Sequence, residues 1–185
     1  TNASSVATGI LTVPSGSSSA INYTVKTNGA IISVPAISVP GYILLDNSCL
    51  GCATRATATT AFLNGAGITI TGALSAGALA GTTGVTINAV ANGSGVGFTQ
   101  GTLAISSLAG GVTITANSQT GIAYSSTGNI IATSQAITIT TTTTTAAGIS
   151  DTGTISGGAV TLTSTQSTST ATATPITATG LITAN

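Results

Sequence analysis

The stretch QAITITTTTTTAAG, residues 135–148, decides the fold class of this chain of 185 residues. Ile137 and Ile139 alternate with threonines, and an unbroken threonine run begins at Thr140. In a β-strand, an alternation with a period of two residues puts the isoleucines on one face and the threonines on the other. The segment is therefore predicted to be a strand with the isoleucines facing the core.

The same alternation returns in three other segments, GVTINAV at 84–90, GVTITAN at 111–117 and AVTLTST at 159–165. β-Branched residues in alternation, bounded by glycine, are typical of half-buried strands. The four alternating cores begin at Val85, Val112, Ile137 and Val160, with spacings of 27, 25 and 23 residues. The glycine-rich segment at 72–81 is a poor helix candidate because glycine is unfavourable inside a helix. The chain is predicted to be all-β.

A second short strand follows each alternating core. Glycine lies 16 residues after the first three core starts, at Gly101, Gly128 and Gly153, and 20 residues after the fourth, at Gly180. The predicted strands that follow cover 102–106, 129–134, 154–158 and 181–185. Such a repeat fits a β-sandwich-like head or a right-handed β-solenoid. The drifting spacing favours the sandwich, because solenoid coils generally keep their length.

The N-terminal region, 1–20, differs from the head domain predicted for 21–185. SVATGILTV at 5–13 has apolar or small residues on both faces, and the linker-like PSGSSSA follows at 14–20. A strand that is apolar on both faces favours burial, and the linker would let it reach a neighbouring subunit. The segment is therefore predicted to be a donor strand, with these residues entering the neighbour: Val6, Gly9, Ile10, Leu11 and Val13. The alternative is that the strand folds back into its own sheet.

Charge is almost absent, with two basic and two acidic side chains and no histidine. No basic patch exists for nucleic acid or an anionic membrane surface, and no apolar run approaches the roughly 20 residues of a spanning helix. General acid–base catalysis has only Asp46 and Asp151 to use. We therefore expect no enzyme activity, no cofactor and no metal site. With so few acids, stability is expected to be nearly flat between about pH 2 and pH 8.

The two cysteines, Cys49 and Cys52, form a CxxC pair. Zinc usually needs four ligands, and no histidine or further cysteine is present to complete the set. A local disulfide is the favoured prediction, with free thiols or a redox site as alternatives.

Four asparagines lie in glycosylation sequons. Asn2, Asn22 and Asn92 fit N-x-[ST], and Asn47 fits the rarer form with cysteine. Covalent glycans would hydrate a surface that has little charge, so the chain is expected to be extracellular.

The neutral β-body, the sequons and the mobile N-terminal strand together resemble the subunits of archaeal surface filaments of the thread type, made by thermoacidophiles. A chain with few acids also has little stability to lose in acid. The resemblance implies an N-glycosylated head that accepts the N-terminal strand of the next subunit. It further implies a cell-surface homopolymer that assembles head to tail and acts in adhesion or biofilm.

Threonine pairs indicate an alternative function. T-x-T occurs at 113–115, 138–140 and 161–163. Such arrays on a flat solenoid face resemble those of ice-binding proteins, and the weak repeat is similar to the solenoid stalks of bacterial adhesins. A β-solenoid adhesin or an ice- or surface-binding module is therefore the alternative to a filament subunit.

Overall fold

The computed structural model describes residues 5–7, 11–12, 21–48, 67–77, 84–168 and 173–184. Within these ranges every regular element is a strand and no helix occurs, which confirms the all-β prediction. The strands are β1 (Ser5–Ala7), β2 (Leu11–Thr12), β3 (Tyr23–Lys26), β4 (Ile31–Val34), β5 (Ile37–Ser38), β6 (Ile43–Asp46), β7 (Ile68–Ile70), β8 (Leu74–Ala76), β9 (Val85–Ala91), β10 (Phe98–Gly101), β11 (Ile105–Ser107), β12 (Val112–Ser118), β13 (Tyr124–Ser126), β14 (Ile130–Thr143), β15 (Ile149–Asp151), β16 (Ile155–Gln166), β17 (Ile176–Ala178) and β18 (Ile182–Ala184).

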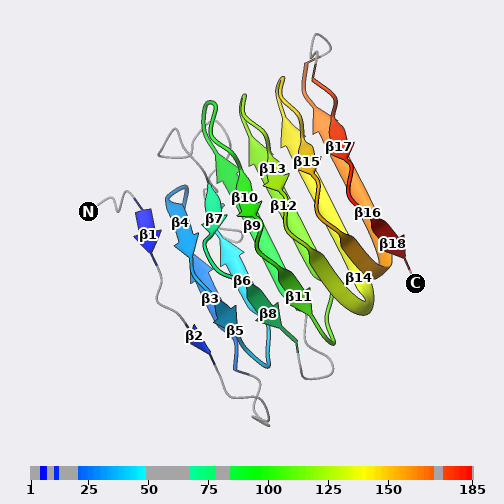
Figure 1. Ribbon diagram of the computed structural model, residues 1–185. Helices are drawn as coiled ribbons and strands as arrows, with labels where there is room; N and C mark the ends of the chain where they lie inside the picture. The colour runs from blue at the N-terminus through cyan, green and yellow to red at the C-terminus, as the bar shows by residue number, and fades with distance from the viewer. Residues whose placement is uncertain are drawn as a thin grey trace.

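The strands are stacked in parallel, coil upon coil. One sheet has seven strands in the order β1-β4-β7-β10-β13-β15-β17, and each of its strands lies one coil after its neighbour (Figure 1). All pairings between the described strands are parallel, and the antiparallel contact among the described residues is an isolated bridge between Asn28 and Ser48. Parallel neighbours need a crossover, which the remaining strands of each coil supply. The architecture is therefore the β-solenoid named as the alternative, and the antiparallel pairs of a sandwich do not occur among the described strands.

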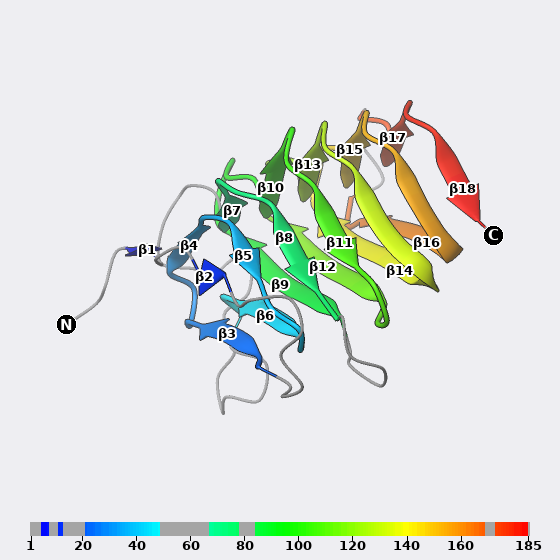
Figure 2. The same cartoon turned by 60° about the horizontal axis from the view of Figure 1, so that its bottom comes forward.

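Each complete coil contributes to three faces (Figure 2). The seven-strand face is the sheet just given. A second, short-strand face contains β2, β5, β8, β11, the first parts of β14 and β16, and β18. The third contains β3, β6, β9, β12 and the second parts of β14 and β16. Because β14 and β16 run around a corner, they join the second and third faces into one continuous set of pairings.

The repeat predicted from the sequence is present in the strand register. Val85, Val112, Ile137 and Val160 are successive Cα partners in β9, β12, β14 and β16. The second set of predicted strands also stacks in register, through Ile105, Ile130, Ile155 and Ile182.

The drift in the spacing comes from three local differences in length. The segment between β9 and β10, 92–97, has six residues, one more than the segment between β12 and β13, 119–123. In β10 the register with β13 shifts between Thr99 and Gly101, so that Gln100 is an extra residue. Between β14 and β16 the register shifts after Ala132, where three residues of β14 face a single residue of β16 at the corner. Ser134 lies in this longer corner at a φ of 56°. The coils therefore change length at a loop, a bulge and a corner while their strands remain aligned, so the drift does not indicate a sandwich.

A column of glycines lines the corner between the seven-strand face and the short-strand face. A Cβ on Gly153 would collide with the carbonyl oxygen of Gly128, and one on Gly180 would collide with that of Gly153. One coil earlier, Leu103 and not Gly101 lies against Gly128. Gly101 instead pairs with Ser126 after the bulge, at a φ of 62°. Gly128, Gly153 and Gly180 therefore occupy equivalent corner positions, whereas Gly101, which has the same spacing from its core start as Gly128 and Gly153, does not.

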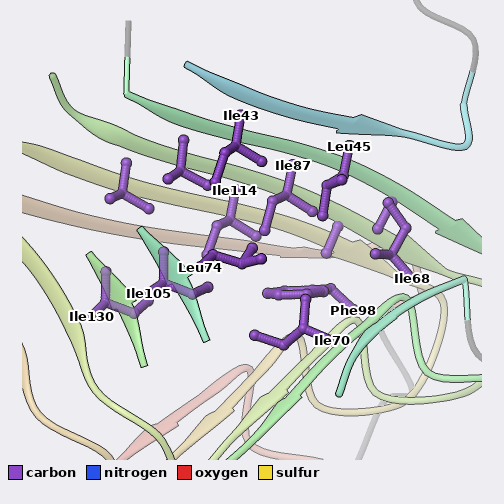
Figure 3. Packing of buried hydrophobic residues seen from close by; sticks show 14 of the residues in the cluster. Ile43, Leu45, Ile68, Ile70, Leu74, Ile87, Phe98, Ile105, Ile114 and Ile130 are labelled. Atoms are coloured by element: carbon purple, nitrogen blue, oxygen red, sulfur yellow. The ribbon is translucent and has the colours of Figure 1, made fainter. Parts of the chain in front are cut away.

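Apolar side chains from all three faces fill the interior. Figure 3 shows Ile87 and Ile114 from the third face, Ile105 from the short-strand face and Phe98 from the seven-strand face pointing into one core. Phe98 stacks on Tyr124 with ring centroids 5.6 Å apart. Burial of a side chain of this size contributes roughly 1.5–3 kcal/mol. The buried side chains of successive coils therefore stabilise the solenoid together.

The predicted donor segment lies against its own chain where it is described. The backbone of β1 pairs in parallel with β4, with Val6 opposite Ile32. The backbone of β2 pairs with β5, with Leu11 opposite Ile37. This arrangement is the fold-back alternative, and Gly9, Ile10 and Val13 lie outside the described residues.

Candidate functional site

The candidate site is the outward surface of four adjacent strands on the third face, which we call the threonine face. It is formed by β9, β12, the segment of β14 from Ile137 to Thr143 and the segment of β16 from Val160 to Gln166. Because these strands pair in register without a bulge, residues at one level form straight columns across them. The first column is Thr86, Thr113, Thr138 and Thr161; the second is Asn88, Thr115, Thr140 and Thr163; the third has Asn117, Thr142 and Thr165, with Val90 at its β9 end.

The threonine side chains in these columns are accessible. They are exposed or half-buried, whereas the inward residues between them in β12 and in this part of β14 are buried. In the part of the chain that the structure describes, the outward threonine hydroxyls have no intramolecular hydrogen bond. Their donors and acceptors are therefore available to water or to a ligand.

Strand geometry gives this array two regular periods. Neighbouring parallel strands are about 4.8 Å apart, and side chains two residues apart along a strand are roughly 6.6 Å apart. Each threonine presents a methyl group and a hydroxyl group, and a β-branched side chain has few χ1 choices in a strand. The face can therefore contact a repeating surface at many points with little loss of side-chain entropy.

Two residues of β6 end the array on the N-terminal side. Leu44 is the partner of Thr86, so it replaces a hydroxyl with an apolar side chain. Asp46 is the partner of Asn88 and is buried; its Oδ1 accepts hydrogen bonds from the backbone nitrogen of Ser48 at 2.9 Å and from the Ser48 hydroxyl at 2.7 Å. The regular surface thus begins at β9.

The sequon asparagines have different environments. Asn22 is exposed, and its Oδ1 accepts a hydrogen bond from the backbone nitrogen of Tyr42 at 3.0 Å. Asn92 is half-buried at the start of a turn, where its backbone oxygen accepts a hydrogen bond from the backbone nitrogen of Gly95 at 3.1 Å. A sugar on either asparagine stays a prediction.

Asn47 lies inside the protein and is fully buried. Its side-chain nitrogen donates to the carbonyl oxygens of Ala30, Gly67 and Val90, at 3.3, 3.2 and 2.9 Å, and its Oδ1 accepts from the Val90 nitrogen at 2.7 Å. A glycan on that nitrogen would displace these bonds and has no space. The folded structure therefore contradicts the expected glycan at Asn47 and gives this side chain a role in joining three coils.

Several predicted residues lie outside the described part of the chain, namely Asn2, Cys49 and Cys52. The predicted disulfide and the sequon at Asn2 therefore remain predictions. Among the residues that the structure does describe, no group of three or more His, Cys, Asp or Glu side chains could hold a metal ion. These residues also include no helix that is long and apolar enough to cross a membrane.

The T-x-T pairs found in the sequence identified the centre of the face and missed its extent. The register adds Thr86, Asn88 and Asn117 beside them, and it extends the array to Thr142 and Thr165. Thr142 and Thr165 could have been found from the sequence by continuing to every second residue beyond each T-x-T. In β14 the uniform threonine run hides that alternation, because Thr141 and Thr143 are buried whereas Thr142 is exposed.

Comparison of the chain with protein-family models, with curated proteins and with solved structures finds no match.

Proposed function

We propose that this chain is an extracellular β-solenoid module that binds an ordered, uncharged surface through the threonine face. The observation that supports the proposal is the register of β9, β12, β14 and β16, which aligns outward hydroxyl side chains in straight columns. A ligand with its own regular lattice can satisfy many of these groups at once. Individually weak contacts then add up across the face.

The chemistry of the face limits the class of ligand. The columns contain no charged side chain, so an ionic mineral or a polyanion finds no counter-charge there. They also contain no aromatic ring that could stack on a sugar or a base. Hydroxyl and methyl groups in a fixed array suit a surface of ordered water, so ice is the ligand that fits this face best.

The test uses ice and two matched tyrosine variants. Thr140→Tyr puts a bulky ring at the centre of the face, between Thr115 and Thr163. Ser150→Tyr puts the same ring on the seven-strand face, at an outward position between Ser125 and Thr177. We expect the wild type and Ser150→Tyr to partition into slowly growing ice, and Thr140→Tyr to lose most of this binding. Equal partition of the two variants, with circular dichroism unchanged, would contradict the proposal.

Crystalline polysaccharide is the second ligand to test. If the wild type binds cellulose or chitin instead of ice, and Thr140→Tyr still abolishes binding, the face is the site of an adhesin. If neither solid binds the folded wild type, the threonine face is not a docking surface.

A filament subunit is the second candidate function, and the short first strands, β1 and β2, favour it. β1 and β2 contribute only three and two residues to their sheets. β1 pairs with β4 and β2 pairs with β5. The identical strands of a neighbouring subunit could form the same pairings, because an exchange of β1 and β2 between subunits replaces each contact with an equal one. In this proposal residues 1–20 of one subunit pair with β4 and β5 of the next, and the chain forms a head-to-tail cell-surface homopolymer with glycans on Asn22 and Asn92.

Deletion of residues 1–13 tests the filament. In the exchange proposal, the deletion abolishes filaments in negative-stain images, and an added peptide of residues 5–13 restores a soluble monomer. A second variant, Leu11→Asp, should behave like the deletion because burying an unpaired carboxylate costs several kcal/mol. Filaments formed by the truncated chain would show that the strand is not a donor.

A further inference from the structure

Ser126 and Asp151 occupy the same interior position in successive coils. They are Cα partners in β13 and β15, and both are buried. Each begins the same corner and accepts a hydrogen bond from the backbone nitrogen two residues later. Gly128 donates to the Ser126 hydroxyl oxygen at 3.0 Å, and Gly153 donates to Oδ1 of Asp151 at 3.4 Å. Asp151 therefore accepts the same corner hydrogen bond in its coil that Ser126 accepts in the preceding coil.

A carboxylate brings a second oxygen and a charge to a position that a serine can fill. Oδ2 of Asp151 is buried and has no hydrogen-bond partner. The nearby polar groups are engaged with one another: the Tyr124 hydroxyl donates to Oε1 of Gln100 at 2.7 Å, and Nε2 of Gln100 donates to the backbone oxygens of Leu103 and Asn129 at 2.7 and 3.0 Å. Hydrogen bonds from Ser126 and Gly153 reach Asp151, but no positive charge in this arrangement offsets the charge of a carboxylate.

The strands around Asp151 contain no cation. β10, β13, β14, β16 and β17 have no Lys, Arg or His within their described bounds, and Tyr124 is their one other titratable side chain. Burial keeps the Tyr124 phenol neutral by raising its pKa well above the ordinary value. An ionised Asp151 would thus be an unpaired buried charge, which is far more costly than a buried neutral acid.

We propose that Asp151 is a proton-dependent stabiliser of the coil that begins with β15: the folded solenoid holds it as the neutral acid, and its ionisation loosens that coil.

The direction of the pH dependence follows from linkage. Burial raises the pKa of Asp151 above its ordinary value of 3.8, and the hydrogen bonds from Ser126 and Gly153 offset only part of this rise. The folded chain therefore binds this proton more tightly than the unfolded chain does. The stabilisation is complete below pH 3.8 and is lost as the pH rises through the pKa of the folded state. Stability should thus increase in acid, in contrast to the nearly flat profile expected from the sequence.

Urea unfolding of the full chain, followed from about pH 3 to about pH 8, tests this inference. Asp151→Asn keeps the shape of the side chain without its charge. Asp151→Ser introduces the residue type that Ser126 supplies at the same position of the preceding coil. We expect the folding equilibrium constant of the wild type to fall across this range, tenfold for each unit by which the pKa is raised. Both variants should lose this fall and be more stable than the wild type near neutral pH, whereas a control variant, Asp46→Asn, should keep it.

Two results would overturn the proposal: a wild type whose stability does not fall with rising pH, or an Asp151→Asn variant that keeps the fall. If neither Asp151 variant folds, the wild type alone still decides the question. The side-chain carboxyl carbon of Asp151, followed by nuclear magnetic resonance, should titrate above pH 3.8. Titration at or below that value would contradict a neutral buried acid.

Discussion

Gly153 lies directly against the backbone oxygen of Gly128, so a Cβ at Gly153 would overlap that atom. The clash involves backbone on both sides, and no side chain can rotate away to relieve it. We therefore expect Gly153→Ala to destabilise the fold by about 3 kcal/mol, the upper part of the range for overpacking. The measurement is the change in the urea midpoint at constant slope.

Gly101→Ala is the matched control for that variant. A Cβ at Gly101 would meet no atom within 4 Å, and only its φ of 62° opposes a side chain. The left-handed conformation costs about 1–2 kcal/mol for an ordinary residue. Gly153→Ala should therefore be the more damaging of the two, and the reverse order would show that these corners do not stack as described.

Much of the fold could be predicted from the sequence because the outward and inward residues alternate so regularly. The alignment of Val85, Val112, Ile137 and Val160 was correct to the residue. The choice between sandwich and solenoid was wrong because the uneven spacing was taken as a property of the strands. It arises from the longer segment 92–97 between β9 and β10, from Gln100, which bulges inward and is buried, and from the short corner at Gly158.

Polar residues of the interior were the least predictable from sequence. Asn47 has the pattern of a sequon, and its bonds to three coils depend on chain segments far apart in sequence. Asp151 looks like any surface turn residue, since a turn sequence DTG is usually solvated. Only the register with Ser126 shows that it points inward.

Replacing Asn47 with alanine should be among the most damaging single changes. It would leave the backbone nitrogen and oxygen of Val90 without the partner they have now. It would also remove one hydrogen bond each from the backbone oxygens of Ala30 and Gly67, which keep the Thr27 hydroxyl and the Ile32 nitrogen as donors. Each unsatisfied buried group costs about 1–3 kcal/mol, so we expect a loss of at least 3 kcal/mol in thermal or urea unfolding. Asn22→Ala, at an exposed sequon with one accepted bond, is the control and should cost about 1 kcal/mol.

Tyr124 should make the fold sensitive to alkali. Burial raises the pKa of its phenol above the ordinary value of 10.0, so the folded state resists ionisation. The stability that this contributes is present below pH 10.0 and is lost as the pH rises beyond it. Tyr124→Phe removes the ionisable group and the bond to Gln100, so it should be less stable near neutral pH yet lose less stability in alkali.

Tyrosinate absorbance during an alkaline titration gives an independent measurement for Tyr124. Its signal should appear together with unfolding and be missing in Tyr124→Phe. A tyrosinate signal assigned to Tyr124 that develops while circular dichroism is unchanged would show that the phenol is accessible in the folded state.

Ile139 and Thr140 are neighbours in β14 that should respond in opposite ways to substitution. Ile139 is fully buried, whereas Thr140 is half-buried on the threonine face. Ile139→Ala should cost about 2–5 kcal/mol of stability through the cavity it leaves. Thr140→Ala should cost about 1 kcal/mol or less, since it removes only strand propensity at an outward position.

The same Thr140→Ala change should weaken binding to ice, whereas Ile139→Ala, at a temperature where it remains folded, should keep most of the binding. Equal losses of stability in the two variants would mean that the strand is shifted by one residue, which would exchange its inner and outer faces.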